Sequence, residues 1–186
     1  MSRKLITLTG PSGIGKGYVK KELKKLFSWV EPPFYTTRKR RPSDDGTRIH
    51  IPEEEFIEKV NKGEINLVNE IYGHKYGLDL NLLEEMFLLE TPVIMELYID
   101  NVALFRDKYP FAKMFAFIPS SPDILLKNME KRGDNEEEIE KRLIAAECEL
   151  EKIEQYVSLF DDVFLIEKEN KNLVRVLYNH LKDYLR

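Results

Sequence analysis

A glycine-rich segment between an apolar run and a helical pattern constrains this chain more than any other feature. The segment matches the pattern G-x-x-x-x-G-K and lacks only a final Ser or Thr, reading Gly10, Pro11, Ser12, Gly13, Ile14, Gly15, Lys16, Gly17. Residues 4–9 before it are typical of a short strand, and residues 16–27 have helical spacing. Glycines let backbone N–H groups surround a phosphate, and a helix N-terminus adds positive potential. The segment therefore predicts a P-loop that binds ATP, with the Lys16 ammonium at the β- and γ-phosphates.

Position 17 departs from the P-loop pattern. A hydroxyl at this position normally ligates Mg²⁺ beside the nucleotide phosphates, and Gly17 removes that ligand. Water can replace it, because Mg²⁺ commonly keeps several waters. We expect ATP binding with Mg²⁺ as cofactor to persist, and magnesium affinity or turnover to be reduced.

Strand-like and helical segments alternate over most of the chain. After the first strand and helix, the expected strands are 93–98, 112–118 and 162–166, and the expected helices are 80–89, 100–108, 122–131, 136–156 and 170–185. Strands that alternate with helices indicate a parallel sheet covered on both faces. The Glu- and Lys-rich stretch 130–154 mixes signs at helical spacing, which is typical of a solvated helix face with i,i+4 pairs.

Residues 34–77 have a different character. They contain the turn signal Asp44-Asp45-Gly46, a helical pattern at 52–61, and two β-like segments at 64–69 and 71–77. We expect a small mixed α/β lobe there. The predicted fold class is α/β, with a P-loop core whose parallel sheet is flanked by helices, and with this lobe inserted.

The length, composition and charge limit the number of domains, the location and the partners that we expect. A chain of 186 residues suits one domain with small inserted lobes. No run of 18 apolar residues and no signal-peptide pattern is present, so we expect a cytoplasmic protein without a membrane partner. The net charge of −4 gives no indication of nucleic-acid binding. The single cysteine, Cys148, excludes an internal disulfide, and we expect it to be buried or half-buried.

A basic cluster stands out in this otherwise acidic chain. Five cations lie within eleven residues: Arg38, Lys39, Arg40, Arg41 and Arg48. Arginine binds phosphate through two parallel hydrogen bonds, so such a cluster near a P-loop indicates a second, phosphorylated substrate. A solvated basic loop and a nucleic-acid patch are the alternatives.

These landmarks together resemble the guanylate kinases over nearly the whole chain. In order, they are Gly10–Lys16, Thr36-Thr37-Arg38-x-x-Arg41, Asp45-Gly46, Gly63-Glu64, Tyr72–Gly77, Arg132-Gly133 and Lys141-Arg142-Leu143. The resemblance implies a P-loop core in residues 1–33 and 78–186, a nucleoside monophosphate (NMP)-binding lobe in residues 34–77, and a mobile helical LID at about 127–146.

The resemblance also implies roles for single residues. Arg38, Arg41 and Tyr76 are similar to the residues that hold the acceptor phosphate. Arg132 and Arg142 are similar to LID arginines that close over the transferring phosphoryl group, and with Lys16 they form the expected catalytic set. Glu96 stands where the family carries an aspartate and is expected to organise Mg²⁺ through water. Two family positions are lost, because Ile49 replaces a phosphate-binding tyrosine and Asn128 replaces a LID arginine.

The guanine-reading positions depart from the family. A serine, a glutamate, a second serine and a second acid of the family fall at Phe34, Leu67, Leu78 and Tyr98. Guanine donors left unpaired in an apolar pocket cost roughly 1–3 kcal/mol each. Phe34 and Tyr98 remain able to stack on a ring of the acceptor, and a shifted alignment would bring Glu64 or Glu70 to the base. We therefore expect the contacts with the acceptor phosphate to be better preserved than the contacts with guanine.

Three functions follow as hypotheses. The first is in-line transfer of the ATP γ-phosphoryl group to the phosphate of a small acceptor, as in a guanylate kinase-like NMP kinase with doubtful specificity for GMP. The second is a sugar-phosphate kinase of the ribose bisphosphate kinase type. The third is a catalytically weak guanylate kinase-like module that binds a phosphorylated partner. An ATP-binding assay separates the kinases from the module.

Overall fold

The computed structural model describes residues 3–40, 46–167 and 171–185, with the side chains of 171 and 172 left out. The strands are β1 (Leu5–Thr9), β2 (Phe34–Thr36), β3 (Arg48–His50), β4 (Leu67–Ile71), β5 (His74–Leu78), β6 (Val93–Glu96), β7 (Lys113–Pro119) and β8 (Asp162–Ile166). The helices are α1 (Lys16–Leu23), α2 (Glu53–Asn61), α3 (Leu80–Met86), α4 (Val102–Lys108), α5 (Pro122–Arg132), α6 (Glu136–Gln155) and α7 (Lys171–Leu185), with 3₁₀ turns η1 (Ile99–Asn101) and η2 (Val157–Leu159).

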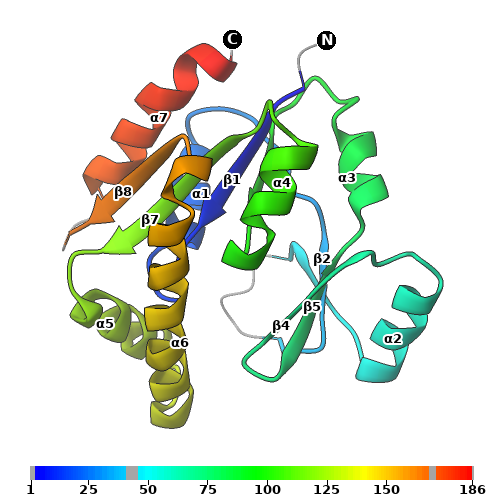
Figure 1. Ribbon diagram of the computed structural model, residues 1–186, viewed down its shortest axis with the longest axis horizontal. Coiled ribbons are helices and arrows are strands. Elements are labelled where there is room, and N and C mark those ends of the chain that lie inside the picture. The colour runs from blue at the N-terminus through cyan, green and yellow to red at the C-terminus, as the bar shows by residue number, and fades with distance from the viewer. Residues whose placement is uncertain (1–2, 41–45, 168–170, 186) are drawn as a thin grey trace.

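The central sheet has the strand order β6-β1-β7-β8, and all of its described pairings are parallel. β1 lies between β6 and β7, with Leu8 opposite Glu96 on one side and opposite Phe115 on the other. The carboxyl ends of β1 and β6 therefore lie together, next to the turn that leads into α1. In parallel α/β sheets, ligands bind at this edge. Figure 1 shows β1 beside β7 and β8 in this sheet.

Alternating side chains of the central sheet build two apolar clusters, one on each face. Ile6, Leu8, Phe115 and Phe117 pack with α1, α5, α7 and part of α6. Leu5, Met95, Met114 and Ala116 pack with α3, α4 and the end of α6. The sheet is thus covered on both faces, as the alternation of strands and helices predicts, and the predicted fold class is confirmed.

A second sheet, with the order β3-β2-β5-β4, is built from strands between Phe34 and Leu78. β2 pairs with β3 in parallel and with β5 in antiparallel fashion, and β4 and β5 form a hairpin. Its turn, Tyr72-Gly73, has positive φ at both residues (54° and 71°), as a two-residue hairpin turn requires. A Cβ on Gly77 would lie 2.4 Å from Ile65 and 2.9 Å from Phe56. Because Gly77 has no side chain, α2 packs closely on β5. The division into a core and an acceptor lobe remains a prediction.

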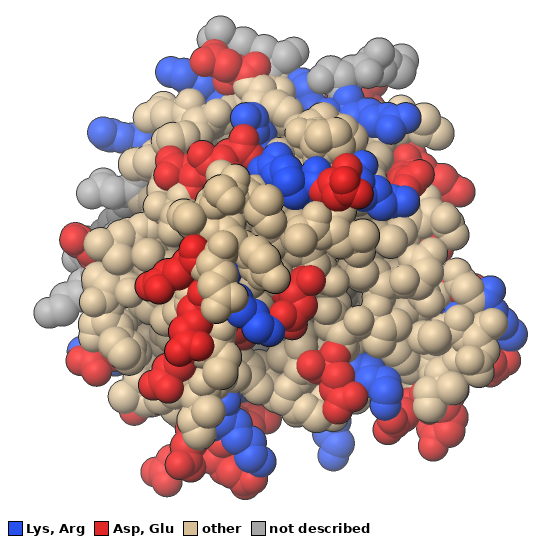
Figure 2. Space-filling view, in the orientation of Figure 1, with Lys and Arg blue, Asp and Glu red and all other residues tan. Residues whose placement is uncertain are grey.

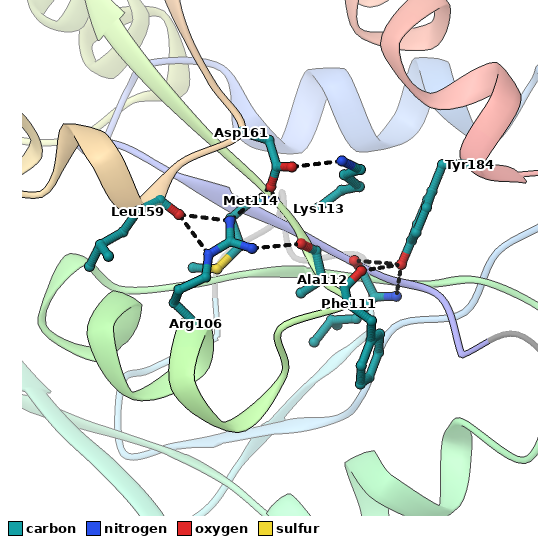
Figure 3. A network of polar contacts seen from close by, with 9 residues as sticks. Arg106, Phe111, Ala112, Lys113, Met114, Leu159, Asp161 and Tyr184 are labelled. Carbon is teal, nitrogen blue, oxygen red and sulfur yellow. Dashed lines mark hydrogen bonds and ion pairs between the residues drawn. The ribbon is translucent and has the colours of Figure 1, made fainter.

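A polar network stabilises the end of the central sheet at which β7 begins (Figure 3). The Asp161 carboxylate accepts hydrogen bonds from Arg106 (2.8 Å), Lys113 (2.7 Å) and the Met114 N–H (2.9 Å). Arg106 also donates to the carbonyl groups of Ala112 and Leu159. This network ties α4 to the segments that precede β7 and β8.

The bounds of the predicted elements agree with the structure to within a few residues, but β2 and β3 were not predicted, and one expectation about a side chain is wrong. Cys148 is exposed rather than buried or half-buried. The buried residues of α6 are Ile139, Arg142, Ala146 and Ile153, and a residue two positions after Ala146 points away from that face. The charged face of α6 is as expected, with Lys141 and Glu137 paired at 2.6 Å and acidic side chains gathered along the helix in Figure 2.

Across the described residues, no helix is both long enough and apolar enough to span a membrane.

Candidate active site

The glycine-rich turn links β1 to α1 and is fixed to the body of the protein at several points. Ile14 is fully buried in the apolar cluster that packs against α1. A Cβ on Gly10 would lie 2.6 Å from the Phe117 carbonyl oxygen, and a Cβ on Gly13 would lie 2.9 Å from that of Leu125. Both glycines have positive φ, so the turn needs glycine for its backbone conformation and for its close packing.

Lys16 begins α1, and its ammonium folds back over the turn. Nζ donates hydrogen bonds to the carbonyl oxygens of Gly10 and Pro11, the latter at 3.2 Å. Burial lowers the pKa of Lys16, and the nearby Glu96 carboxylate opposes that shift. The cation is thus held at the mouth of the turn, in position to meet an anion.

The two expected LID arginines converge on Ser12 in the turn. Arg142 Nη1 lies 3.1 Å from the Ser12 hydroxyl oxygen, and Arg132 Nη2 lies 3.4 Å from it. Asp134, between α5 and α6, binds both guanidinium groups: Arg132 donates to it twice, and Arg142 lies 3.3 Å away. Its side chain is almost completely buried, so this carboxylate fixes the two arginines relative to each other.

Asn128 on α5 also contacts the glycine-rich turn. Its Nδ2 donates to the Gly13 carbonyl oxygen at 2.7 Å. The residue that replaces a family arginine here therefore has a structural partner. It joins α5 to the turn without adding a charge.

One cleft of about 1140 Å³ brings the two groups of expected site residues together. The glycine-rich turn, Lys16, Arg132 and Arg142 line one part, and Arg38, Tyr76 and Tyr98 line another. The rings of Tyr76 and Tyr98 pack against each other in a tilted arrangement, with centroids 5.9 Å apart. Arg41 lies outside the described residues.

Local hydrogen bonds position Arg38. The buried Thr36 hydroxyl accepts a hydrogen bond from the Arg38 N–H at 3.1 Å, and His50 Nδ1 lies 2.7 Å from the Arg38 carbonyl oxygen. Arg38 Nη1 donates to the Lys39 carbonyl oxygen at 2.9 Å. The guanidinium is largely buried, yet it contributes to the cleft wall. Such a cation is prepared to bind an anion.

The expected guanine-reading positions form a single row across the second sheet. Leu78 on β5 is paired in register with Phe34 on β2 and with Leu67 on β4. Leu67 and Leu78 are buried in the apolar cluster beneath α3 and α4, and Phe34 packs against it. None of these three residues belongs to the described wall of the cleft.

Neither of the two nearby acids can replace the lost base-reading groups in this structure. Glu64 is exposed and pairs with Lys59 at 2.9 Å. Glu70 is exposed and lies opposite Lys75 in the hairpin, three residues along β4 from Leu67 and therefore on the other face of the strand. A one-residue step along a strand turns a side chain to the other face.

A buried ion-pair network lies next to Lys16, and the sequence gives no sign of it. Lys20, one helical turn after Lys16, has its Nζ 2.6 Å from Glu31 and 3.0 Å from Glu96. Arg48 on β3 approaches the other oxygen of Glu96 at 3.6 Å. Burial disfavours the charged form of Lys20, but the two carboxylates outweigh burial and raise its pKa. Burial likewise opposes ionisation of Glu96, and Lys20, Lys16 and Arg48 together hold its pKa well below the usual range.

We tested whether these residues suit a protein-held magnesium ion. Mg²⁺ prefers oxygen ligands in octahedral geometry and is usually bound through one or two carboxylates, waters and substrate phosphates. Gly17 offers no side-chain oxygen, and both oxygens of Glu96 face cations. The described residues contain no group of three or more His, Cys, Asp or Glu side chains arranged to hold a metal. The donor set does not fit an ion held directly by this protein.

Two further cleft residues were missing from the sequence predictions. The Arg142 guanidinium lies over the Tyr72 ring, 5.2 Å from its centroid, which joins the β4–β5 hairpin to α6. Glu149 on α6 lines the cleft, and burial raises the pKa of its carboxyl group. Tyr72 and Glu149 have common residue types in ordinary hairpin and helix patterns, so only their placement reveals them.

The fold and the glycine-rich turn define a P-loop NTPase core with an arginine-lined cleft. The family model described as guanylate kinase matches residues 2–185. A guanylate kinase of Lactobacillus acidophilus is 32% identical over 157 residues, covering 82% of this chain and 77% of that protein. One of Desulfitobacterium hafniense is 31% identical over 176 residues, covering 91% and 88%. The chain belongs to the guanylate kinase family.

A solved structure supports the fold independently. The crystal structure of guanylate kinase from Anaplasma phagocytophilum superposes with a TM-score of 0.73 at 18% identity, covering 98% of this chain and 86% of that one.

Proposed function

We propose that this protein is an ATP-dependent phosphotransferase of the NMP kinase type whose acceptor is a small phosphorylated molecule, with GMP a poor acceptor. The row Phe34-Leu78-Leu67 carries this proposal. All three side chains are apolar, and two are fully packed into the core, so they offer no hydrogen bond to the N1–H and N2–H donors of guanine. The family relatives are named guanylate kinases. By the resemblance, this chain keeps Arg38, Arg41 and Tyr76 for the acceptor phosphate, although Ile49 stands at one phosphate-binding position, and it lacks the base-binding groups.

The proposed roles follow the two parts of the cleft. Lys16 and the backbone of residues 10–17 hold the phosphates of ATP. Arg38, Arg41 and Tyr76 hold the acceptor phosphate, and Tyr98 offers a ring face to the rest of the acceptor. Arg132 and Arg142, fixed by Asp134, stabilise the negative charge of the transferring phosphoryl group. The protein positions two anions in line and excludes water, and it forms no covalent bond itself.

A sugar phosphate is the second candidate acceptor, and the same apolar row favours it. A ribose phosphate presents a phosphate and hydroxyl groups but no base. A ribose phosphate therefore needs no hydrogen-bonding groups at the positions of Phe34, Leu67 and Leu78. The cations at this part of the cleft would bind its phosphate as they would bind that of a nucleotide.

The experiment is a coupled assay of ADP release with ATP and a panel of acceptors: the nucleoside monophosphates and ribose phosphates. Arg38→Ala should raise the acceptor KM by about tenfold to a hundredfold, because a charge-assisted hydrogen bond contributes about 1.5–3 kcal/mol. The Kd for ATP should change little. Arg175→Ala, at an exposed position of α7, is the matched control. ATP binding without any accepted phosphate would instead favour a module that binds a phosphorylated macromolecule.

A further inference from the structure

The residues around Glu96 differ from what a magnesium-dependent nucleotide site needs. A carboxylate beside a phosphate-binding loop repels the phosphates unless a cation neutralises it. A magnesium ion between carboxylate and phosphates is the usual solution. Here the carboxylate has a protein cation instead, since Lys20 Nζ is 3.0 Å from Glu96 Oε1.

The position of Lys20 makes this cation a fixed part of the site. Lys20 is 4% exposed, and its ammonium is clamped between Glu31 at 2.6 Å and Glu96 at 3.0 Å. A buried ion pair with two carboxylate partners cannot swing into solvent without leaving those carboxylates uncompensated. Lys20, Glu31, Glu96 and Lys16 all belong to the wall of one cleft.

The residue after Lys16, Gly17, also differs from what a protein-held magnesium ion needs. A residue with a hydroxyl would fit at position 17, because a Cβ built there meets no atom within 4 Å. The glycine is therefore not required by packing in this structure. Position 17 therefore has no hydroxyl ligand, and the carboxylate that would organise the metal is engaged by Lys20 and Arg48.

We propose that Lys20 takes the place of a protein-organised magnesium ion at Glu96, so that this protein binds ATP equally well with and without Mg²⁺. The inference rests on the proposed function only in assuming that ATP is the nucleotide. Lys20 acts through Glu96 and is a positioning residue. It neutralises the carboxylate and leaves the charge of Lys16 available to the phosphates.

The test measures the Kd for ATP by titration calorimetry, once with excess EDTA and once with excess Mg²⁺. For the natural sequence the two values should agree within about threefold. The informative variant is Lys20→Leu/Glu31→Leu, which removes the buried pair and leaves Glu96 without Lys20. Replacing a buried pair by apolar side chains of similar size is often tolerated, whereas removing one partner is not. In this variant, ATP affinity in EDTA should fall by at least about tenfold, and Mg²⁺ should restore it.

The control is Lys62→Leu/Glu58→Leu, which makes the same change of residue types at an exposed pair 2.6 Å apart on α2. Thermal melting of each protein verifies that it is folded. The inference is overturned if the natural sequence loses tenfold or more of its ATP affinity in EDTA, about 1.4 kcal/mol. It is also overturned if the Lys20→Leu/Glu31→Leu variant binds ATP independently of the metal. Absence of ATP binding under both conditions overturns the proposed function, and the inference with it.

Discussion

The guanidinium of Arg142 donates a hydrogen bond to the Ser12 hydroxyl, with 3.1 Å between Nη1 and Oγ. The first residue belongs to the long helix α6 and the second to the glycine-rich turn, 130 positions earlier in the chain. Because Asp134 binds both Arg142 and Arg132, the two charges that we propose for the transferring group already lie beside the glycine-rich turn. Preorganised charge of this kind lowers the barrier without reorganisation during the reaction.

Arg142→Ala should therefore lower kcat by about 10²–10³-fold while the Kd for ATP changes by only a few fold. Arg142→Lys keeps the charge but loses the planar fork, so it should recover only part of the rate. Steady-state kinetics and ATP titration on the two variants provide the comparison. An unchanged kcat in Arg142→Ala would remove this residue from the proposed catalytic set.

Lys16→Ala should abolish measurable phosphoryl transfer and weaken ATP binding sharply. The change deletes the ammonium that lies over the carbonyl oxygens of the turn. Lys25→Ala, at an exposed position shortly after α1, is the control and should behave like the natural sequence. Turnover that survives in Lys16→Ala would contradict the P-loop assignment.

Gly17→Ser should make ATP affinity more dependent on magnesium, because it adds a hydroxyl ligand where there is space for a side chain. Gly17→Ala separates this effect from helix stabilisation, since either substitution removes a glycine from α1 but only serine adds an oxygen. Alanine should raise the free energy of unfolding by about 0.5–1 kcal/mol and leave the magnesium response unchanged. Equal magnesium responses in the two variants would show that the hydroxyl adds no ligand.

Asp161→Ala should lower the free energy of unfolding by about 1–3 kcal/mol, because Met114 N–H and Arg106 lose an acceptor in the partly buried network of Figure 3. Urea unfolding of both proteins measures the difference. Lys182→Ala, in the last turn of α7, is the surface control. A difference within the experimental error would mean that the two carbonyl partners of Arg106 suffice.

The stabilisation by Asp161 should also depend on pH in a defined direction. Burial opposes ionisation, but Lys113, the Met114 N–H and Arg106 outweigh it and hold the pKa of Asp161 below its ordinary value of 3.8. A lowered pKa in the folded state means that the contribution is complete above the unfolded value and is lost as pH falls through the folded value. The difference between the natural protein and Asp161→Ala should thus be constant at neutral pH and shrink below about pH 4.

The sequence predicts the architecture and the glycine-rich turn because their signals are local. The turn Gly10–Gly17 has a fixed spacing between a strand and a helix, and the strands of the central sheet are short apolar runs between helical patterns. The proposed loss of base-reading groups likewise rests on the identities of Phe34, Leu67 and Leu78. Their burial side by side in one row is visible only from the strand register.

The ion-pair network is not predictable from the sequence. Lys20 lies four residues after Lys16 in a helix rich in lysine, a pattern that indicates a solvated face. Its partner Glu31 looks like a surface acid in the sequence. Glu96 is singled out by the resemblance, but nothing local pairs it with Lys20. Asp134 is a similar case, since the sequence Arg132-Gly133-Asp134-Asn135 is typical of a helix end and conceals a carboxylate that binds two arginines.

We propose that this family member binds its acceptor through the phosphate and not through a guanine base. GMP and ribose 5-phosphate carry the same phosphate on the same sugar and differ by the base alone. Titration calorimetry of the two compounds, in the presence of a non-hydrolysable ATP analogue, measures what the base contributes. We expect Kd values within about threefold of each other. GMP binding tighter by a hundredfold or more, about 2.7 kcal/mol, would show a working guanine pocket and contradict the account.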